Sequence, residues 1–473
     1  MVKSLALSLA LSSSIVAPAT AGDTTFQESN AVLLNVTQAD LNRVLRDAFH
    51  ASGAARLQGT RDRASRGISD VTYTAGLSEP TLTLSPDGRM VLGVEIMSAR
   101  LNIGSIERRV LRRRMHCENA SVTVEPGDPV DVTLALRLAV EDRDLRIIPE
   151  QVTLANTGAF RLHRPSQCRN NPLPEFLMWW LGKGRLRQRI EKLDALLLAR
   201  AREGVAALYE DHGLLSKQWR LGETEGDVFL YPQIIDTRNG SLLIGLTGAS
   251  HVGQDEAAPA PEWVAGTSGS FIGLSRQFVN SAVRAALRER DAQPRPPEGG
   301  LRKLFKSDAI YALIPGLRGV ESRDALRLAF NFPTAPEISF AAIDAAGSEP
   351  ERAMIRIALT DVEISLFEAA GDELRWIGSA DVDSALISVV PYGNRRGGIS
   401  FDVVDNEWRV TSRGIEFDEE TLAATFQEMV FGEVFETRFE PLGEESLDFK
   451  ETRFAPSYFS RVGDYLVIGL TGL

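Results

Sequence analysis

The sequence has little of the chemistry from which metal centres are built. It holds only 2 cysteines and 5 histidines in 473 residues. No His-x-x-x-His or Cys-x-x-Cys spacing occurs, and such spacings are what place ligands around zinc. The sequence therefore predicts no metal site and no cofactor. The scattered histidines are His50, His116, His163, His212 and His251.

Motifs for nucleophilic catalysis and for phosphate binding are also missing. There is no Gly-x-Ser-x-Gly elbow and no Gly-x-x-x-x-Gly-Lys loop. Residues 266–270 resemble the elbow in composition alone. Because aspartate and glutamate are abundant, the sequence does not exclude a pair of catalytic carboxylates. We expect a protein that is not an enzyme, and an enzyme acting on envelope glycolipid is the less favoured alternative.

Long apolar runs are absent after the first twenty residues. Residues 1–21 have Lys3, a short apolar core and an Ala19-Thr20-Ala21 end, which is the pattern of a secretory signal peptide. No later apolar run reaches about 18 residues, the length that a membrane-spanning helix needs. The sequence thus predicts a periplasmic or secreted protein that is soluble after cleavage.

The negative charge is concentrated in the second half. The formal net charge is −12. Residues 22–250 hold 29 Lys and Arg against 28 Asp and Glu, which is +1, and residues 251–473 hold 22 against 36, which is −14. A chain with one neutral and one acidic half lacks the basic surface of a nucleic-acid binder. No nucleic-acid partner is expected.

The two cysteines, Cys117 and Cys168, both lie in the first half. In an oxidising compartment they can pair, and closing a loop of this length stabilises by about 4 kcal/mol in the chain-entropy model. The alternative is two free thiols. The export signal favours a disulfide bond.

One stretch occurs twice and organises the rest of the chain. Residues 31–53 and 269–287 each begin with an apolar run, continue with a hydroxyl residue suited to cap a helix, and then show apolar residues at helical spacing. The hydroxyl residues are Thr37 and Ser275, separated by 275 − 37 = 238 positions, and Asn42 and Asn280 follow at the same offset. Each copy predicts a strand that leads into an amphipathic helix.

A second pair of segments closes the two halves. Residues 242–248 read LLIGLTG and residues 466–472 read LVIGLTG, an offset of 466 − 242 = 224. Two units that open and close alike predict a duplication. We expect a signal peptide at 1–21, domains at 22–248 and 269–473, and a linker at 249–268.

Period-two alternation predicts antiparallel strands between these ends. Residues 54–69 are expected to form a loop or a frayed end of the first helix. A long helix is predicted from Arg185 to His212, and a second at 419–435. The expected strands lie at 81–84, 90–103, 121–124, 130–140, 147–154, 159–162, 228–231, 242–246, 325–332, 338–340, 353–367, 374–390, 399–404, 447–454 and 464–470.

This order of elements resembles the tubular lipid-binding (TULIP) superfamily, in the tandem form found in bactericidal/permeability-increasing protein and plasma lipid-transfer proteins. The resemblance rests on Thr37 with Leu41-Asn42, on Ser275 with Val279-Asn280, and on the segment from Phe176 into the Arg-rich helix. It implies an α+β fold of two tandem domains, each a long helix wrapped by a strongly bent antiparallel sheet. The near-neutral first half differs from the cationic first domain of the family's lipopolysaccharide binders.

The resemblance also implies a function, which is to hold acyl chains of a lipid or glycolipid in apolar tubes for binding or transfer. The alternative is that the same apolar faces pack closed cores, which would make the chain a structural or adhesion module of the cell envelope. Periodicity does not separate a lined tube from a filled one. The residues expected to line the tubes are Leu41, Val44, Leu45, Ala48, Phe49, Leu193, Leu197, Val279, Val283 and Leu287.

Two cationic clusters are candidates for contact with an anionic headgroup or membrane surface. Guanidinium groups on a hairpin tip suit lipid phosphate, and aromatic rings beside cations suit a membrane interface. The alternatives are a solvated strand face for the first cluster and a buried tryptophan pair for the second. The first cluster is Arg108, Arg109, Arg112, Arg113 and Arg114, and the second contains Trp179, Trp180, Lys183 and Arg185.

The signal peptide gives a first testable prediction. Cleavage after Ala21 should leave a mature chain that begins at Gly22. Intact-mass measurement and amino-terminal sequencing of the protein from its native host would check this. A chain that retains Met1 after export would contradict it.

Overall fold

The computed structural model describes most of the chain. Its described residues are 27–65, 68–85, 88–110, 113–141, 144–163, 165, 167–169, 193–212, 219–221, 228–238, 240–249, 269–288, 294–297, 314–320, 322–343, 352–371, 373–393, 399–414 and 454–472. The predicted signal peptide, most of the predicted linker and the predicted helix at 419–435 lie outside them.

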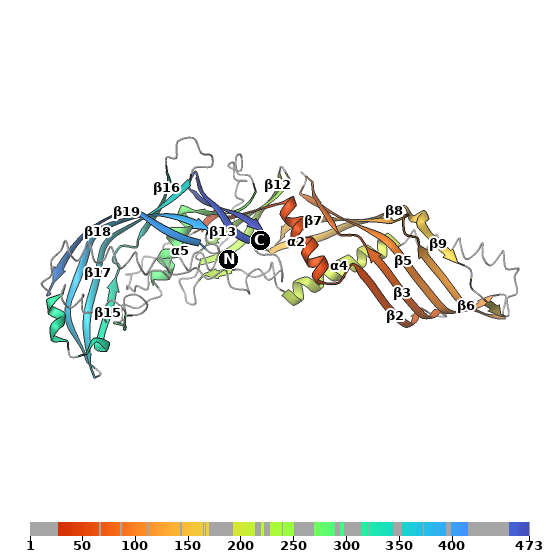
Figure 1. The fold of residues 1–473 in the computed structure, drawn as a ribbon, viewed down its shortest axis with the longest axis horizontal. Helices are drawn as coiled ribbons and strands as arrows, with labels where there is room; N and C mark the ends of the chain where they lie inside the picture. Colours follow the sequence, from red (N-terminus) through yellow and green to blue (C-terminus); the bar gives the residue numbers. More distant parts are fainter. Residues whose placement is uncertain are drawn as a thin grey trace.

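Two antiparallel sheets make up most of an elongated, arched molecule (Figure 1). The first, a nine-stranded sheet, contains β2 (Arg56–Ser65), β3 (Ile68–Leu77), β4 (Thr81–Leu84), β5 (Arg89–Val110), β6 (Arg113–Val124), β7 (Val130–Glu141), β8 (Asp144–Ala155), β9 (Phe160–His163) and β10 (Gln167–Arg169).

The second sheet has twelve strands and includes the ends of both predicted domains. It contains β1 (Gln27–Thr37), β11 (Trp219–Leu221), β12 (Val228–Arg238), β13 (Ser241–Ala249), β14 (Ser270–Ser275), β15 (Leu326–Asn331), β16 (Glu337–Ile343), β17 (Arg352–Ala370), β18 (Glu373–Gly393), β19 (Ile399–Arg413), β20 (Phe454–Val462) and β21 (Tyr465–Gly472).

Helices are few. The described residues contain three α-helices, α2 (Gln38–Ala51), α4 (Leu193–His212) and α5 (Arg276–Arg288). Short 3-10 helices are η1 (Thr157–Ala159), η2 (Pro315–Gly319) and η3 (Arg323–Ala325).

The expected α+β fold, with a long helix wrapped by a bent sheet in each domain, is wrong. The described chain is mostly β, with large antiparallel sheets. Residues 56–65, expected in a loop or frayed helix, form strand β2, because their polar side chains suit the exposed edge of a sheet. The strands are also longer than alternation predicted: β5 has 22 residues and β18 has 21.

A period-two pattern of apolar residues underestimates the length of long strands, because local irregularities shift the alternation within them. In β6 the buried residues are Met115 and Cys117 before Asn119, but Ala120 and Val124 after it. Asn119 has a positive φ of 58°, which turns the strand by one position and keeps the apolar residues on one face.

The same irregularity crosses three strands. Asp70 in β3 has a φ of 53°, and it lies level with Asn119 on either side of Gly104 in β5. A Cβ at Gly104 would come within 2.7 Å of the Cβ of Asp70, so the close approach requires glycine. Aspartate and asparagine tolerate a left-handed backbone better than other side chains do.

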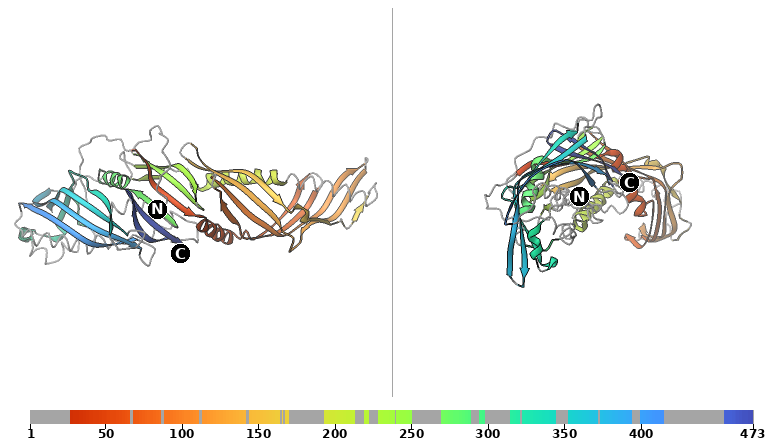
Figure 2. Two further views of the ribbon diagram at one scale, coloured as in Figure 1. Left: turned by 90° about the horizontal axis from the view of Figure 1, so that it is seen from above. Right: turned by 60° about the vertical axis from the view of Figure 1, so that its left-hand side comes forward.

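The middle of the molecule joins the two halves in one sheet, and Figures 1 and 2 show strands extending from it to both sides. Strands β1 and β14 pair antiparallel, with Val32 opposite Leu274 and Leu34 opposite Ile272. On the outer side of β1 lie β13 and β12, and on the outer side of β14 lie β21 and β20.

Hydrogen-bond registers in the two arms correspond to the sequence offsets. Val36 lies opposite Leu242, and Leu274 lies opposite Leu466, which are the same positions after offsets of 238 and 224. Both outer pairs also carry a bulge after a proline, at Pro232 opposite Leu246 and at Pro456 opposite Leu470. The superposition of the complete units 22–248 and 269–473 stays a prediction.

Both helices that follow these strands begin with the predicted hydroxyl cap. The Thr37 hydroxyl accepts a hydrogen bond from the backbone N–H of Asp40 at 3.2 Å, and the Ser275 hydroxyl accepts one from Phe278 at 2.9 Å. Each cap satisfies a backbone donor that the first turn of a helix leaves free.

The paired asparagines fasten each helix to a strand. Asn42 donates to the carbonyl of Leu82 at 2.8 Å and accepts from its N–H at 2.6 Å. Asn280 makes the same two bonds with Ile338, also at 2.8 and 2.6 Å. Each amide additionally donates to a carbonyl one helical turn back, that of Gln38 or Arg276 at 2.9 Å.

The amide clamp gives a second prediction. Aspartate at position 280 has no donor for the carbonyls of Arg276 and Ile338, and its charge would be buried. Asn280→Asp should lower the free energy of unfolding by about 3 kcal/mol or more, and by more than Asn280→Ala does. Urea denaturation of the full chain at neutral pH measures both variants.

The matched control is Asn42→Asp, because the clamp of Asn42 is only partly buried. It should cost less than the same change at Asn280. Equal and small changes in the free energy of unfolding for Asn280→Asp, Asn280→Ala and Asn42→Asp would show that the asparagine side chains do not fasten the helices.

Candidate functional site

Helix α2 presents apolar side chains that are not fully covered. None of its residues is buried: Leu41, Val44, Leu45 and Phe49 are half-buried, and Ala48 is exposed. The helix is held in place by its cap and by the bond of Asn42 to β4. The apolar stripe is therefore fixed in position and open on one side.

Helix α5 has the same cap and clamp but a different environment. Val279, Ala282 and Val283 correspond to Leu41, Val44 and Leu45, and their exposed fractions are only 2, 6 and 5 %. They belong to the large apolar core that strands β15 to β18 share. The second unit thus buries the face that the first unit leaves partly open.

The nine-stranded sheet beside α2 has an apolar face of the same half-buried kind. Cross-strand rows join Leu82, Leu92 and Leu134, and also Leu84, Met90 and Leu136. Leu92, Leu134 and Leu136 are half-buried, and so are Val94 and Val132 in the next row. The rows form a ladder of aliphatic side chains.

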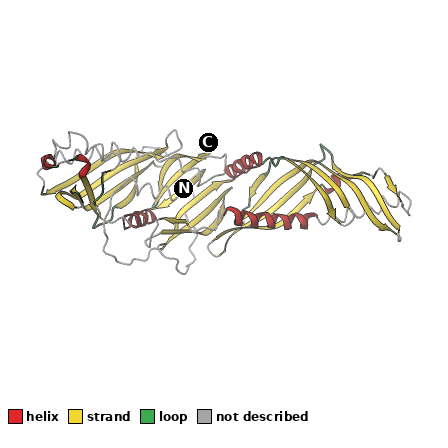
Figure 3. Ribbon diagram, turned by 90° about the horizontal axis from the view of Figure 1, so that it is seen from below, coloured by secondary structure: helices red, strands yellow, loops and turns green. Residues whose placement is uncertain are grey.

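A small apolar cluster lies where β6 ends and β7 begins. It consists of Val124, Val130 and Ala159, with Phe160 packed against it. Figure 3 shows α4 lying along the nine-stranded sheet, where it contacts β8 and where Arg202 donates to the carbonyl of Pro149 at 3.3 Å. We call the half-buried residues of α2 and of this sheet the first-unit apolar surface: Leu41, Val44, Leu45, Phe49, Leu92, Val94, Val132, Leu134 and Leu136.

The residues predicted to line tubes have different positions in the structure. Four are on the first-unit apolar surface, and Leu197 in α4 is half-buried. Val279 and Val283 are core residues of the second unit. The side chains of Leu193 and Leu287 lie outside the described part of the chain.

The first arginine cluster flanks a hairpin turn. Arg109 at the end of β5 lies opposite Arg114 near the start of β6, and Arg108 lies opposite Met115. Arg114 is exposed. Arg112 and the second cluster, Trp179, Trp180, Lys183 and Arg185, lie outside the described residues, as do the side chains of Arg108, Arg109 and Arg113.

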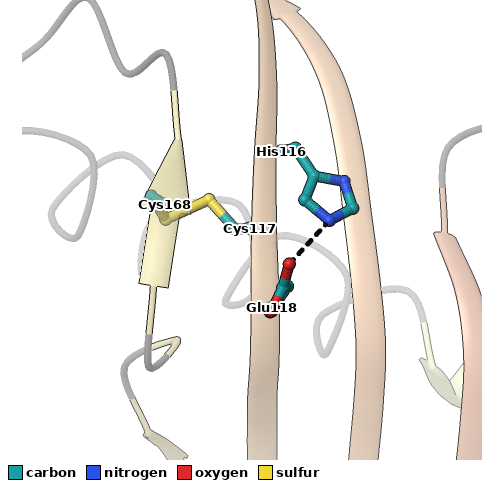
Figure 4. The surroundings of a disulfide bond; sticks show 4 residues. All are labelled: His116, Cys117, Glu118 and Cys168. Carbon is teal, nitrogen blue, oxygen red and sulfur yellow. Dashed lines mark hydrogen bonds and ion pairs between the residues drawn. A yellow bond between two sulfur atoms is a disulfide. The ribbon is translucent and has the colours of Figure 1, made fainter.

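The predicted disulfide bond between Cys117 and Cys168 is confirmed. The two cysteines face each other on β6 and β10 with their Cα atoms 4.1 Å apart. Figure 4 shows the bond beside His116, whose Nε2 lies 3.2 Å from the carboxylate of Glu118. A disulfide suggests an oxidising compartment.

A polar network joins the two units at the start of each helix. The Ser270 hydroxyl, at the start of β14, donates to the carboxylate of Asp40 and accepts from the N–H of Thr37 at 3.0 Å. At the other helix, Ser275 hydrogen-bonds to the carboxyl of Glu28 in β1. Each helix cap is thus contacted by a strand of the other unit.

Glu28 is the strongly perturbed acid of this junction. Burial raises its pKa from 4.5 to about 7, against the lowering effect of Ser275, and Asp464 raises it further. Its Oε2 atom is buried and has no hydrogen-bond partner among the described residues. Burial, Glu28 and Asp464 together raise the pKa of Tyr465 to about 12, and its hydroxyl donates to the carbonyl of Asn30 at 2.9 Å.

Sequence reasoning missed Glu28 and Ser270. Their neighbours come from residues more than two hundred positions away, so no local pattern marks them. The described residues contain no helix long and apolar enough to cross a membrane. Nor do they contain three His, Cys, Asp or Glu side chains grouped as metal ligands.

Comparisons with known proteins give a distant likeness only. No protein-family model matches the chain, and no curated protein matches it. Among solved structures, a crystal structure of lipopolysaccharide binding protein is similar, with 11 % identity and a TM-score of 0.40. The match covers 94 % of this chain and 98 % of that one. A likeness this weak carries no argument about function.

The perturbed acid gives a third prediction. The folded-state pKa of Glu28 is above its ordinary value, so the folded protein holds this proton more tightly than the unfolded chain does. The contribution of Glu28 to stability is therefore greatest below pH 4.5 and is lost as the pH rises to about 7.

Glu28→Gln keeps the side chain neutral at every pH. It should raise the free energy of unfolding at pH 8 by about 1–2 kcal/mol, since the group is only partly buried, and remove this loss between pH 4.5 and 7. Denaturation at a series of pH values tests this, with Glu79→Gln, an exposed acid on the β3–β4 connection, as the control. A variant less stable than wild type at pH 8 would contradict it.

Proposed function

We propose that the chain is an exported lipid-binding protein that holds acyl chains of a lipid or glycolipid against the first-unit apolar surface. The observation that carries this proposal is the contrast between two equivalent helices. Val279 and Val283 are buried, whereas Leu41 and Leu45 at the same positions remain half-buried on a fixed scaffold. The apolar face of α2 stays partly exposed, although the equivalent face of α5 is buried, and such a face is suited to bind an apolar ligand reversibly.

An acyl chain matches this surface chemically. The rows of leucine and valine offer aliphatic contact along several neighbouring strands. Burial of each methylene of a lipid would contribute about 0.8 kcal/mol, so a long chain gains several kilocalories without any polar contact. Binding, rather than chemistry, is therefore the activity that these residues support, and the protein is proposed not to be an enzyme.

A headgroup site is proposed at the arginine-bearing hairpin of β5 and β6. Arg109 and Arg114 lie on opposing strands there, and Arg114 is exposed. Guanidinium groups in pairs suit phosphate or carboxylate. The same groups could contact an anionic membrane surface when lipid is loaded or released, as transfer between membranes requires.

The second unit favours the alternative function for its own half. Its core contains Phe278, Leu317, Leu326 and Ile355 at exposed fractions of 0 or 1 %, and side chains of β1, β12 and β13 belong to the same cluster, so this core is closed by the protein's own side chains. We propose a structural role for this unit, rather than a second ligand. The export signal and the disulfide bond support a periplasmic or secreted location.

The proposal predicts that polar substitution of α2 separates binding from stability. Leu41→Ser with Leu45→Ser should weaken binding of a fluorescent fatty acid at least about tenfold, while each change costs only about 1 kcal/mol of folding stability. Fluorescence titration and thermal denaturation of the full chain measure the two effects. Native mass spectrometry of wild-type protein should find co-purified lipid bound at one site.

The matched control is Val279→Ser with Val283→Ser in α5. Because these side chains are buried, each change should cost about 2–4 kcal/mol and leave fatty-acid binding unchanged wherever the protein is folded. Absence of lipid and of probe binding in wild type, together with a large stability loss in the α2 variant, would reject the lipid-binding function and favour a purely structural one.

A further inference from the structure

The far end of the second unit carries large apolar side chains on its outside. Leu374 and Trp376 have exposed fractions of 49 and 50 %. They stand at the start of β18, directly after the turn at Gly371 that joins it to β17, and Figure 1 shows these strands at the end of the molecule away from the nine-stranded sheet. Single exposed apolar residues are common, but neighbours on one hairpin tip form a patch.

The register places further apolar residues beside them. Trp376 lies opposite Phe367, and Leu374 lies opposite Ala369. The register shifts by one residue between Leu366 and Phe367, and Ile377 is the extra residue in β18. Trp376 therefore lies on the face of half-buried Phe367 and Ala369, and not on the face of buried Leu366. We call Phe367, Ala369, Leu374 and Trp376 the distal patch.

The ring of Trp376 is seated on the neighbouring strand. A Cβ added at Gly414 would lie 2.5 Å from the Cη2 atom of Trp376, which places the ring directly against the end of β19. The ring of Trp376 is thus packed on one face, and its other face is accessible to a binding partner. Its position does not depend on a partner.

Arginines lie beside the distal patch on both neighbouring strands. Arg327 in β15 is opposite Phe367, and Arg413 in β19 precedes Gly414. The Arg413 side chain is 68 % exposed, whereas that of Asp381, which pairs with it, is 15 % exposed. Arg375 and Glu368 repeat this arrangement at 64 and 6 %.

The charges thus have a direction. The guanidinium groups of Arg413 and Arg375 face solvent and their carboxylate partners lie inward, which complements phosphate groups at a surface. Arg327 is half-buried and donates to the backbone carbonyls of Asp324 and Leu326. The exposed acids Asp324 and Glu373 nearby reduce the net charge. Apolar contact, rather than long-range attraction, should therefore dominate the interaction of this tip.

We propose that the distal patch is a surface that docks on phospholipid bilayers. Tryptophan and leucine would enter the headgroup region, where an aromatic ring meets both apolar and polar surroundings, and the exposed Arg413 would contact lipid phosphate. The distal patch lies at the end of the second unit, apart from the first-unit apolar surface. The docking proposal therefore stands or falls independently of the lipid-binding proposal.

Vesicle co-sedimentation of the full chain tests the docking surface. The vesicles are phosphatidylcholine, with and without phosphatidylglycerol. Wild-type protein should bind both, and Leu374→Ser with Trp376→Ser should bind at least about tenfold more weakly. Val404→Ser is the matched control, because Val404 is an aliphatic residue of β19 that is 54 % exposed but lies outside the distal patch; it should bind like wild type.

Fluorescence quenching gives a second measurement that does not require a polar substitution. Brominated phosphatidylcholine should quench Trp376 when the protein is bound. Trp376→Phe should keep at least half of the vesicle affinity but lose that part of the quenching, since phenylalanine preserves an aromatic side chain.

Several outcomes would overturn the proposal. Equal vesicle binding of wild type and the double serine variant is one, and quenching that persists unchanged in Trp376→Phe is another. A third is wild-type protein that does not bind vesicles but dimerises in sedimentation, with the dimer lost in the double variant, because the patch would then join two copies of the chain.

Discussion

The pairing of β1 with β14 is the contact on which the rest of the structure depends. It makes the strands that open the two units neighbours in one sheet, with Leu34 opposite Ile272 at the centre. The backbone groups on the other edges of both strands are taken by β13 and β21. Each opening strand therefore has both edges paired. All six residues of β14 are also buried, and coverage of both faces explains why its sequence does not alternate.

This arrangement also positions the helices. Each helix follows directly from an opening strand, is capped by a hydroxyl group at the junction, and is clamped by an asparagine to a strand of its own unit. Ser270 and Glu28 then contact the cap of the other unit's helix. The orientation of α2 is thus set by the central sheet, and the open stripe does not have to collapse onto the nine-stranded sheet.

Local features of the fold could be predicted from sequence. The caps at Thr37 and Ser275 and the strand positions of both closing segments follow from residues close in the chain. The disulfide followed from compartment and number of cysteines. The predicted fold class was wrong for two reasons. The alternation of apolar and polar residues is broken at residues such as Asn119, and the sequences of polar edge strands such as β2 resemble those of loops.

The contrast in burial between α2 and α5 could not be predicted from the sequence. Leu45 and Val283 occupy equivalent helical positions, and periodicity gives them the same expectation, yet their burial differs. What decides burial is the set of strands packed against each helix, which comes from distant parts of the sequence. The burial of Glu28 depends likewise on Ser275 and Asp464. The exposure of Trp376 follows from a bulge that shifts one strand by a residue.

The order of strands in the twelve-stranded sheet has a consequence for how the chain reaches its folded state. Strand β14 has its second edge covered by β21, which begins 465 − 275 = 190 positions after β14 ends. During synthesis, the apolar segment from Ser270 to Ser275 must remain with an open edge for nearly two hundred residues. Contacts this distant in sequence form slowly, and open apolar edges associate with other chains. Closure of this edge therefore follows the synthesis of β14 by a long interval, so loss of β21 would leave the protein prone to aggregation.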